Sequence, residues 1–215
     1  MPITSLVTDK WWSTHRIACM KRWWVSALLV VGAVTPAHAA PNYVFPVSGC
    51  SYTYAHSHHN YPATDIITHI GCNFVAPTAG VIDEVNRVDR FSWKTNKGAD
   101  RGGLSVSMIG DDGVRYYGSH LSSVPANIVS GVRVAPGDLI AKTGNSGDAR
   151  GTTPHLHFGI SWPTPSQSNV WWVRRGELYP WPFLDAWKAG KDLSPALSVA
   201  KLEKKVGEIP KQVGY

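Results

Sequence analysis

The chain has 215 residues, which is enough for one domain with a well-packed core. Its 20 glycines and 15 prolines lie between short apolar runs, a composition that favours turns and short strands over long helices. The formal net charge is +6, but the basic residues form no dense stripe. Composition therefore excludes a typical nucleic-acid-binding protein and gives only weak support for an anionic partner such as a cell-wall polymer.

The N-terminal region has the pattern of a secretory signal peptide. A basic pair follows Met20, an apolar run covers residues 23–34, and an Ala-His-Ala cleavage site ends at Ala39. We therefore predict that translation starts at Met20, that residues 1–39 are removed, and that the protein is exported to the periplasm or the extracellular space. The apolar run is short for a membrane span, so we expect no membrane association after cleavage; an uncleaved anchor is the alternative.

Removal of residues 1–39 lowers the number of basic side chains from 21 to 17 and of acidic ones from 15 to 14, for a mature net charge of +3. It also removes Cys19 and leaves Cys50 and Cys72. An even pair of cysteines in an oxidising compartment predicts a disulfide between them. The alternative is a pair of thiolate ligands for zinc, although their spacing matches no compact Cys-x-x-Cys site.

The next part of the chain, residues 40–165, is expected to form an antiparallel all-β domain. Apolar runs of strand length are separated by turns, and Asp-Asp-Gly at 111–113 predicts a hairpin. Two Gly-rich loops, 92–103 and 145–154, lie between other strands. The predicted strands cover 64–71, 78–88, 104–110, 114–121, a pair within 131–144, and 155–162.

The C-terminal part differs in composition. Residues 166–193 are aromatic, and we expect an appendage packed on the β domain, with a short helix at 183–189. Residues 194–215 are polar and charged, which is typical of a solvated tail or a loose helix. A wall-binding module that stacks on sugars is another reading of the aromatic part, and its candidate residues are Trp171, Trp172, Trp181 and Trp187.

Two histidines, His155 and His157, stand two positions apart in the last predicted strand. Side chains at i and i+2 share one face of a strand, so both rings can serve one site; two half-exposed strand histidines are the alternative. Upstream, "HSHHNYPATDI" (56–66) adds three histidines and Asp65. Two imidazoles and a carboxylate, with a fourth position open, are the ligand set of a catalytic zinc site. His120, at another strand end, is free to act as proton donor, base or oxyanion stabiliser.

The order of these motifs resembles peptidase family M23, the lysostaphin-like zinc metallopeptidases that cut peptidoglycan. A His…Asp pair is followed by "APTAGVI", a Gly-rich loop, "SHL", "VAPGDLIAKTGNSG" and "HLHF". The resemblance runs from about Pro46 to Trp162. It implies a β-sheet zinc endopeptidase whose partners are peptidoglycan peptides.

The resemblance also implies a role for each matching residue. His157, the second histidine of His-x-His, and Asp65 bind one zinc ion. The first histidine, His155, stands beside the metal and stabilises the transition state or moves a proton, and His120 does similar work.

The third metal ligand departs from the family pattern. The family usually has three residues between the upstream histidine and the aspartate, and here that position is Tyr61. An insertion that contains Pro62 would have to loop out. We therefore predict His59 as the ligand, with His58 as the alternative.

Other polar residues leave the choice open. Neighbours in a strand alternate, so one of Tyr116 and Tyr117 can reach the site as an oxyanion helper. Asp100 and Arg101 either line a groove or are ordinary polar loop residues. Asp148 is expected to shape the loop before His-x-His.

Together these patterns predict a monomeric, exported zinc endopeptidase that hydrolyses amide bonds in peptidoglycan stem or cross-bridge peptides. Its zinc would be held by His59, Asp65 and His157. The alternative is a zinc-free relative that binds the cell wall or activates an amidase.

Overall fold

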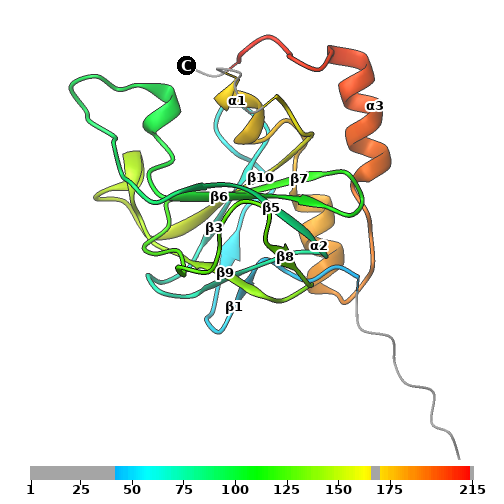
Figure 1. The fold of residues 1–215 in the computed structure, drawn as a ribbon, viewed down its shortest axis with the longest axis horizontal. Coiled ribbons are helices and arrows are strands. Elements are labelled where there is room, and N and C mark those ends of the chain that lie inside the picture. The colour runs from blue at the N-terminus through cyan, green and yellow to red at the C-terminus, as the bar shows by residue number, and fades with distance from the viewer. Residues whose placement is uncertain (1–41, 166–169, 214–215) are drawn as a thin grey trace, which may run out of the picture. The chain divides into compact units, whose positions relative to one another are not determined.

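The computed structural model describes residues 42–165 and 170–213, in which two antiparallel sheets form the centre (Figure 1). The predicted signal peptide lies outside these residues. The larger sheet has the strand order β2-β3-β10-β7-β6-β5-β8, and the smaller has the order β1-β4-β9. The prediction of an antiparallel β fold is confirmed. The strands are β1 Val47–Ser48, β2 Thr53–Tyr54, β3 Thr64–Ile67, β4 Asn73–Val75, β5 Gly80–Asn86, β6 Ser105–Gly110, β7 Arg115–Ser119, β8 Arg133–Val134, β9 Leu139–Lys142 and β10 His155–Ser161.

The α-helices of the described residues all follow β10. The helix expected at 183–189 is present one to two residues earlier, as α2. A third helix, α3, occupies the segment expected to be a loose helix or a solvated tail. No helix in the described part of the chain is both long and apolar enough to cross a membrane. The helices are α1 Trp171–Arg174, α2 Trp181–Lys188 and α3 Ala196–Val206, and two 3₁₀ turns, η1 Gly98–Asp100 and η2 Gly147–Ala149, lie in the Gly-rich loops.

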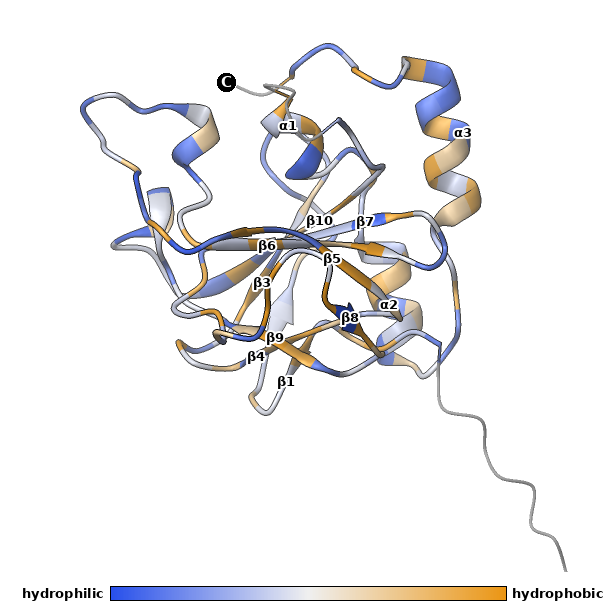
Figure 2. Cartoon of the chain, in the orientation of Figure 1, coloured by the Kyte–Doolittle hydropathy of each residue, from blue (hydrophilic) through white to orange (hydrophobic). Residues whose placement is uncertain are grey.

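One face of the larger sheet builds the core. Along β10, Leu156 and Phe158 are fully buried, while His155 and His157, at the alternate positions, point to the other face. The same core includes Phe74 of β4 and Trp187 of α2. The Trp187 ring contacts the Phe158 ring edge to face. In Figure 2 β9 is largely hydrophobic and β8 is partly hydrophilic, and α3 mixes hydrophobic and hydrophilic residues. The second face of the large sheet is therefore left for polar chemistry.

A disulfide joins Cys50 to Cys72, as predicted. It connects the segment before β2 to the start of β4, with a Cα–Cα distance of 5.8 Å. The chain between the two cysteines carries His58, His59 and Asp65. Both ends of this segment are thus fixed to the β domain.

The C-terminal aromatic residues are used for packing. Trp187 is only 4% exposed, and its Nε1 donates a hydrogen bond to the Leu193 carbonyl at 2.9 Å. Trp172 donates from Nε1 to the Pro210 carbonyl at 3.1 Å. These contacts argue against a free sugar-stacking surface made of these tryptophans.

Candidate active site

Strand register places Asp65 beside His157. The two residues are directly opposite one another in the β3–β10 pair, and on the other side of β10 His157 is opposite Ser119 of β7. Opposed residues in antiparallel strands share a face of the sheet, so these side chains meet on the polar face. His157 Nδ1 lies 2.9 Å from Asp65 Oδ1, and His157 Nε2 lies 2.9 Å from the Arg175 carbonyl oxygen.

The loop before β3 brings in a second imidazole, that of His58. Its side chain is only 3% exposed, and its Nε2 lies 3.6 Å from Asp65 Oδ1. Its Nδ1 is 3.1 Å from the Tyr61 carbonyl, and its ring centroid is 5.1 Å from that of His157. His59, the next residue, is exposed. His58, His59 and Asp65 can each offer one ligand atom, and these three atoms lie within 4.8 Å of one another.

This arrangement fits a metal ion. Both nitrogens of His157 face acceptor oxygens, and an Nδ1 lone pair can face the Asp65 carboxylate only with a proton or a cation between them. His58 Nε2 points to the same carboxylate oxygen. The outer nitrogens of both rings face main-chain carbonyls, which is the usual way in which metal-binding histidines are oriented. Two imidazole nitrogens and a carboxylate oxygen are donors that zinc accepts.

Two further histidines flank this cluster. His155 Nδ1 lies 2.8 Å from the Thr153 carbonyl, and His155 Nε2 is 3.9 Å from Asp65 Oδ1. His120 Nδ1 lies 2.9 Å from the Ser146 carbonyl. The rings of His120 and His155 are 4.9 Å apart at their centroids. In each ring Nδ1 therefore carries the hydrogen that the carbonyl accepts, which leaves Nε2 as the nitrogen that can take part in proton transfer.

The backbone of His120 explains how its ring reaches the site. Strict alternation would place His120 on the face opposite Ser119. Instead its φ is 61°, the left-handed conformation that non-glycine residues seldom adopt. Strand β7 ends here, and the turned backbone brings the His120 ring to 5.9 Å from that of His157.

The surroundings of Asp65 and His120 determine the protonation states of these two residues. Burial alone would raise the pKa of the Asp65 carboxyl, but hydrogen bonds from His157 and His58 hold that pKa well below its usual range. Burial, together with the charges of His157 and His155, lowers the pKa of His120 to about 3. Asp65 is thus ionised and His120 neutral at physiological pH.

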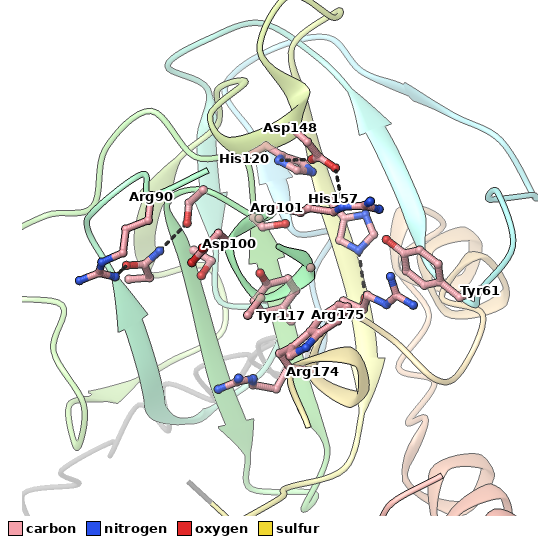
Figure 3. Close-up of a pocket in the computed structure, with 18 of the residues that line it drawn as sticks. Tyr61, Arg90, Asp100, Arg101, Tyr117, His120, Asp148, His157, Arg174 and Arg175 are labelled. Atoms are coloured by element: carbon pink, nitrogen blue, oxygen red, sulfur yellow. Dashed lines mark hydrogen bonds and ion pairs between the residues drawn. The ribbon is translucent and has the colours of Figure 1, made fainter. Parts of the chain in front are cut away.

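A cavity of about 630 Å³ opens beside these groups (Figure 3). Of the residues left open by the sequence, Tyr117, Asp100 and Arg101 line it, whereas Tyr116 is buried and donates a hydrogen bond to Asp112. Further lining residues are His59, Tyr61, Glu84, Arg90, His120, Asp148, His157, Trp171, Arg174 and Arg175.

Asp148 also lies at the cavity, a position that its sequence context did not indicate. Asp148 was expected only to shape its loop, but its side chain lines the cavity. Burial raises the pKa of its carboxyl. Its Oδ1 lies 3.9 Å from His120 Nδ1.

Comparison with protein families identifies the chain. The model of peptidase family M23 matches residues 59–169, which is more than half of the chain. The chain belongs to peptidase family M23. No curated protein sequence matches this M23 family member significantly.

Solved structures resemble this M23 family member at low identity. The catalytic domain of lysostaphin, an antimicrobial peptidase from Staphylococcus simulans, is 26% identical over 62% of this chain and 92% of its own, with a TM-score of 0.47. The larger lysostaphin structure is 24% identical over 74% of this chain and 59% of its own, with a TM-score of 0.50. LytM from Ruminococcus gnavus, a candidate glycyl-glycine endopeptidase, is 23% identical over 70% and 62%, with a TM-score of 0.51. The last two show a common fold, and this chain spans less than two thirds of their length.

Reasoning from the sequence of this M23 family member reached most of the site and missed one wall. The residues of that wall are Tyr61 and the C-terminal Trp171, Arg174 and Arg175, none of which was assigned to the site; Glu84 and Arg90, on the cavity lining, were missed as well. The two arginines and the tryptophan stand close together in "WWVRRGE", but no spacing rule relates that run to the histidines. The predicted residues that the structure brings together around Asp65 are His59, His120, His155 and His157, with the alternative His58.

Proposed function

We propose that this M23 family member is an exported zinc endopeptidase that hydrolyses amide bonds in peptidoglycan stem or cross-bridge peptides. One observation carries the proposal: the inner nitrogens of two buried histidines converge on one ionised carboxylate, while their outer nitrogens are held by carbonyls. A site for binding alone would not need the additional imidazoles of His120 and His155 beside this cluster.

We propose His58, Asp65 and His157 as the zinc ligands. The sequence predicts His59 in place of His58. His58 is favoured here because its ring is buried, its Nδ1 is held by the Tyr61 carbonyl and its Nε2 faces Asp65. His59 is exposed and stands at the cavity, where it can contact a ligand or the substrate.

When bound, zinc polarises the scissile carbonyl and makes a water molecule nucleophilic near neutral pH. The protein's own groups handle the protons. The Nε2 lone pairs of His120 and His155 can accept a proton from the attacking water and return it to the leaving amine. Tyr117, on the cavity wall, can donate a hydrogen bond to the developing oxyanion. The cavity between Tyr117 and the C-terminal segment would hold the peptide.

The first test is the zinc content of the protein purified from cells that express the full chain, with digestion of purified peptidoglycan followed by mass spectrometry. We expect about one zinc per chain and new amide termini in the wild type. His58→Ala and Asp65→Ala should lose both zinc and cleavage. His56→Ala is the matched control, because His56 pairs with Asp185 and stacks on Trp181 instead of facing the site.

Three results would contradict parts of this proposal. Loss of zinc in His59→Ala, with zinc retained in His58→Ala, would make His59 the ligand. A wild-type protein that binds the wall without zinc or cleavage would be a wall-binding or activator protein. Zinc binding without cleavage of any peptidoglycan would leave a metal site with another substrate.

A further inference from the structure

The C-terminal segment reaches the proposed metal site through one residue, Arg175. This residue follows α1 and lies beyond residues 59–169, the part that matches the family model. It is 9% exposed, although it carries a permanent charge. Its surroundings show what holds a buried guanidinium here.

The main chain of Arg175 contacts one proposed ligand. Its carbonyl oxygen accepts the hydrogen bond from His157 Nε2 at 2.9 Å. This contact leaves Nδ1 to face Asp65. Gly159 makes the approach possible, because a Cβ at that position would lie 2.2 Å from the Arg175 oxygen.

The side chain of Arg175 contacts the loop of the other ligand. Its guanidinium carbon lies 3.6 Å from the centroid of the Tyr61 ring, a close cation–π contact. The guanidinium also donates to the Val213 carbonyl, and it lies 5.1 Å from the Trp171 ring centroid. Tyr61 in turn offers its carbonyl to His58 Nδ1. Figure 3 shows Tyr61 and His157 beside Arg175.

We propose that Arg175 is a positioning residue of the metal site, which orients His157 through its carbonyl and His58 through the Tyr61 ring. One residue outside residues 59–169, the part that matches the family model, thereby fixes the ring orientation of two proposed ligands. The insertion that displaces the upstream histidine puts Tyr61 at the usual ligand position, and Arg175 holds that tyrosine in place. This inference rests on the proposed function, because it assumes that His58 and His157 bind zinc.

The test is the zinc dissociation constant, measured by competition with a chelator on the purified protein. Substitution of groups that orient metal ligands typically weakens metal binding 10- to 100-fold. We expect a weakening of about 10-fold or more in Arg175→Met, which keeps the main chain and the apolar stem but removes the guanidinium. Arg133→Met is the matched control, because Arg133 lies on β8, an edge strand of the larger sheet, and pairs with Asp111 in the turn between β6 and β7. Its zinc affinity should stay within twofold of wild type.

Variants of Tyr61 separate a positioning role from a general loss of structure. Tyr61→Ala should weaken zinc binding as Arg175→Met does, whereas Tyr61→Phe, which keeps the ring, should bind nearly as wild type. The two losses should be non-additive in Arg175→Met with Tyr61→Ala, because both break the same contact. The visible spectrum of the Co²⁺-loaded proteins should change with Arg175→Met and not with Arg133→Met. If Arg175→Met does not fold, the Tyr61 pair carries the test.

The outcomes distinguish this inference from the proposed function. Zinc affinity within twofold of wild type in Arg175→Met, or equal losses in Tyr61→Phe and Tyr61→Ala, would overturn the positioning role alone. A lowered melting temperature of the metal-free protein with unchanged zinc affinity would make Arg175 a purely structural residue. Absence of zinc binding in the wild type would overturn the proposed function, and this inference with it.

Discussion

At the scale of single residues, the site is made by hydrogen bonds that fix the direction of each imidazole. Four histidines each have one ring nitrogen on a main-chain carbonyl, and the second nitrogen is left for the chemistry of the site; those of His58 and His157 face Asp65. The sequence supplies the histidines, but the carbonyls come from loops and from the C-terminal segment. The pairs are His58 with Tyr61, His120 with Ser146, His155 with Thr153 and His157 with Arg175.

Asp65, His155 and His157 could be predicted because strand alternation and motif order determine their relation. The choice between His58 and His59 could not, because it depends on how the insertion around Pro62 folds. Nor could Arg175, whose contact with His157 spans 18 positions and follows no repeating pattern.

Gly159→Ala tests the carbonyl contact at the residue scale. The added methyl would lie 2.2 Å from the Arg175 oxygen, so the Arg175 main chain must move away from His157 Nε2. We expect zinc binding to weaken about 10-fold. Gly118→Ala is the matched control: it lies on the neighbouring strand, and its Cβ would strike Phe74 in the core at 2.3 Å. That variant should lower the melting temperature and leave zinc affinity unchanged; equal zinc affinities in the two variants would contradict the argument.

At the scale of elements, the long strands could be predicted, whereas the short strands β1 and β2 could not. Strands β5, β6, β7 and β10 have five to seven residues, enough for apolar alternation to appear. Strands β1 and β2 have two residues each, too few to form a pattern. They are set in place by pairing with β4 and β3, a tertiary effect.

The disulfide between Cys50 and Cys72 leads to a prediction about the stability of the fold. It closes the segment that carries His58 and Asp65, and the two cysteines are 22 positions apart in the sequence. A loop of this size should stabilise the fold by about 3 kcal/mol. Cys50→Ala with Cys72→Ala should therefore lower the melting temperature by roughly 6–12 °C in a chain of this length. Reduction of the wild type should give a similar shift, as followed by circular dichroism, and a shift below 2 °C in both experiments would contradict the prediction.

At the scale of the whole molecule, the C-terminal segment belongs to the domain that it follows. The core includes Val173 of α1, Leu184 of α2 and Val199 of α3. These side chains pack the segment on the core of the described residues. The expectation of a solvated tail did not foresee such contacts, because it rested on the polar side chains of residues 194–215. Three main-chain carbonyls of this segment accept hydrogen bonds from other parts of the fold. These are Glu208 to Trp162, Pro210 to Trp172 and Val213 to Arg175.

Deletion of residues 207–215 tests whether the end of the chain supports the site. It would leave three donors without their acceptors, among them Trp162, which is 1% exposed. Each buried donor without a partner costs about 1–3 kcal/mol, so the loss of stability should be several kcal/mol. Zinc affinity should fall as well, because Arg175 loses the Val213 carbonyl that holds its guanidinium over Tyr61. Leu197→Ser on α3 is the control, since that side chain is 87% exposed and its replacement should change neither the stability nor the zinc affinity. Chemical denaturation measures the stability, and chelator competition measures the zinc affinity. A deletion variant with wild-type stability and zinc affinity would show that residues 207–215 are dispensable.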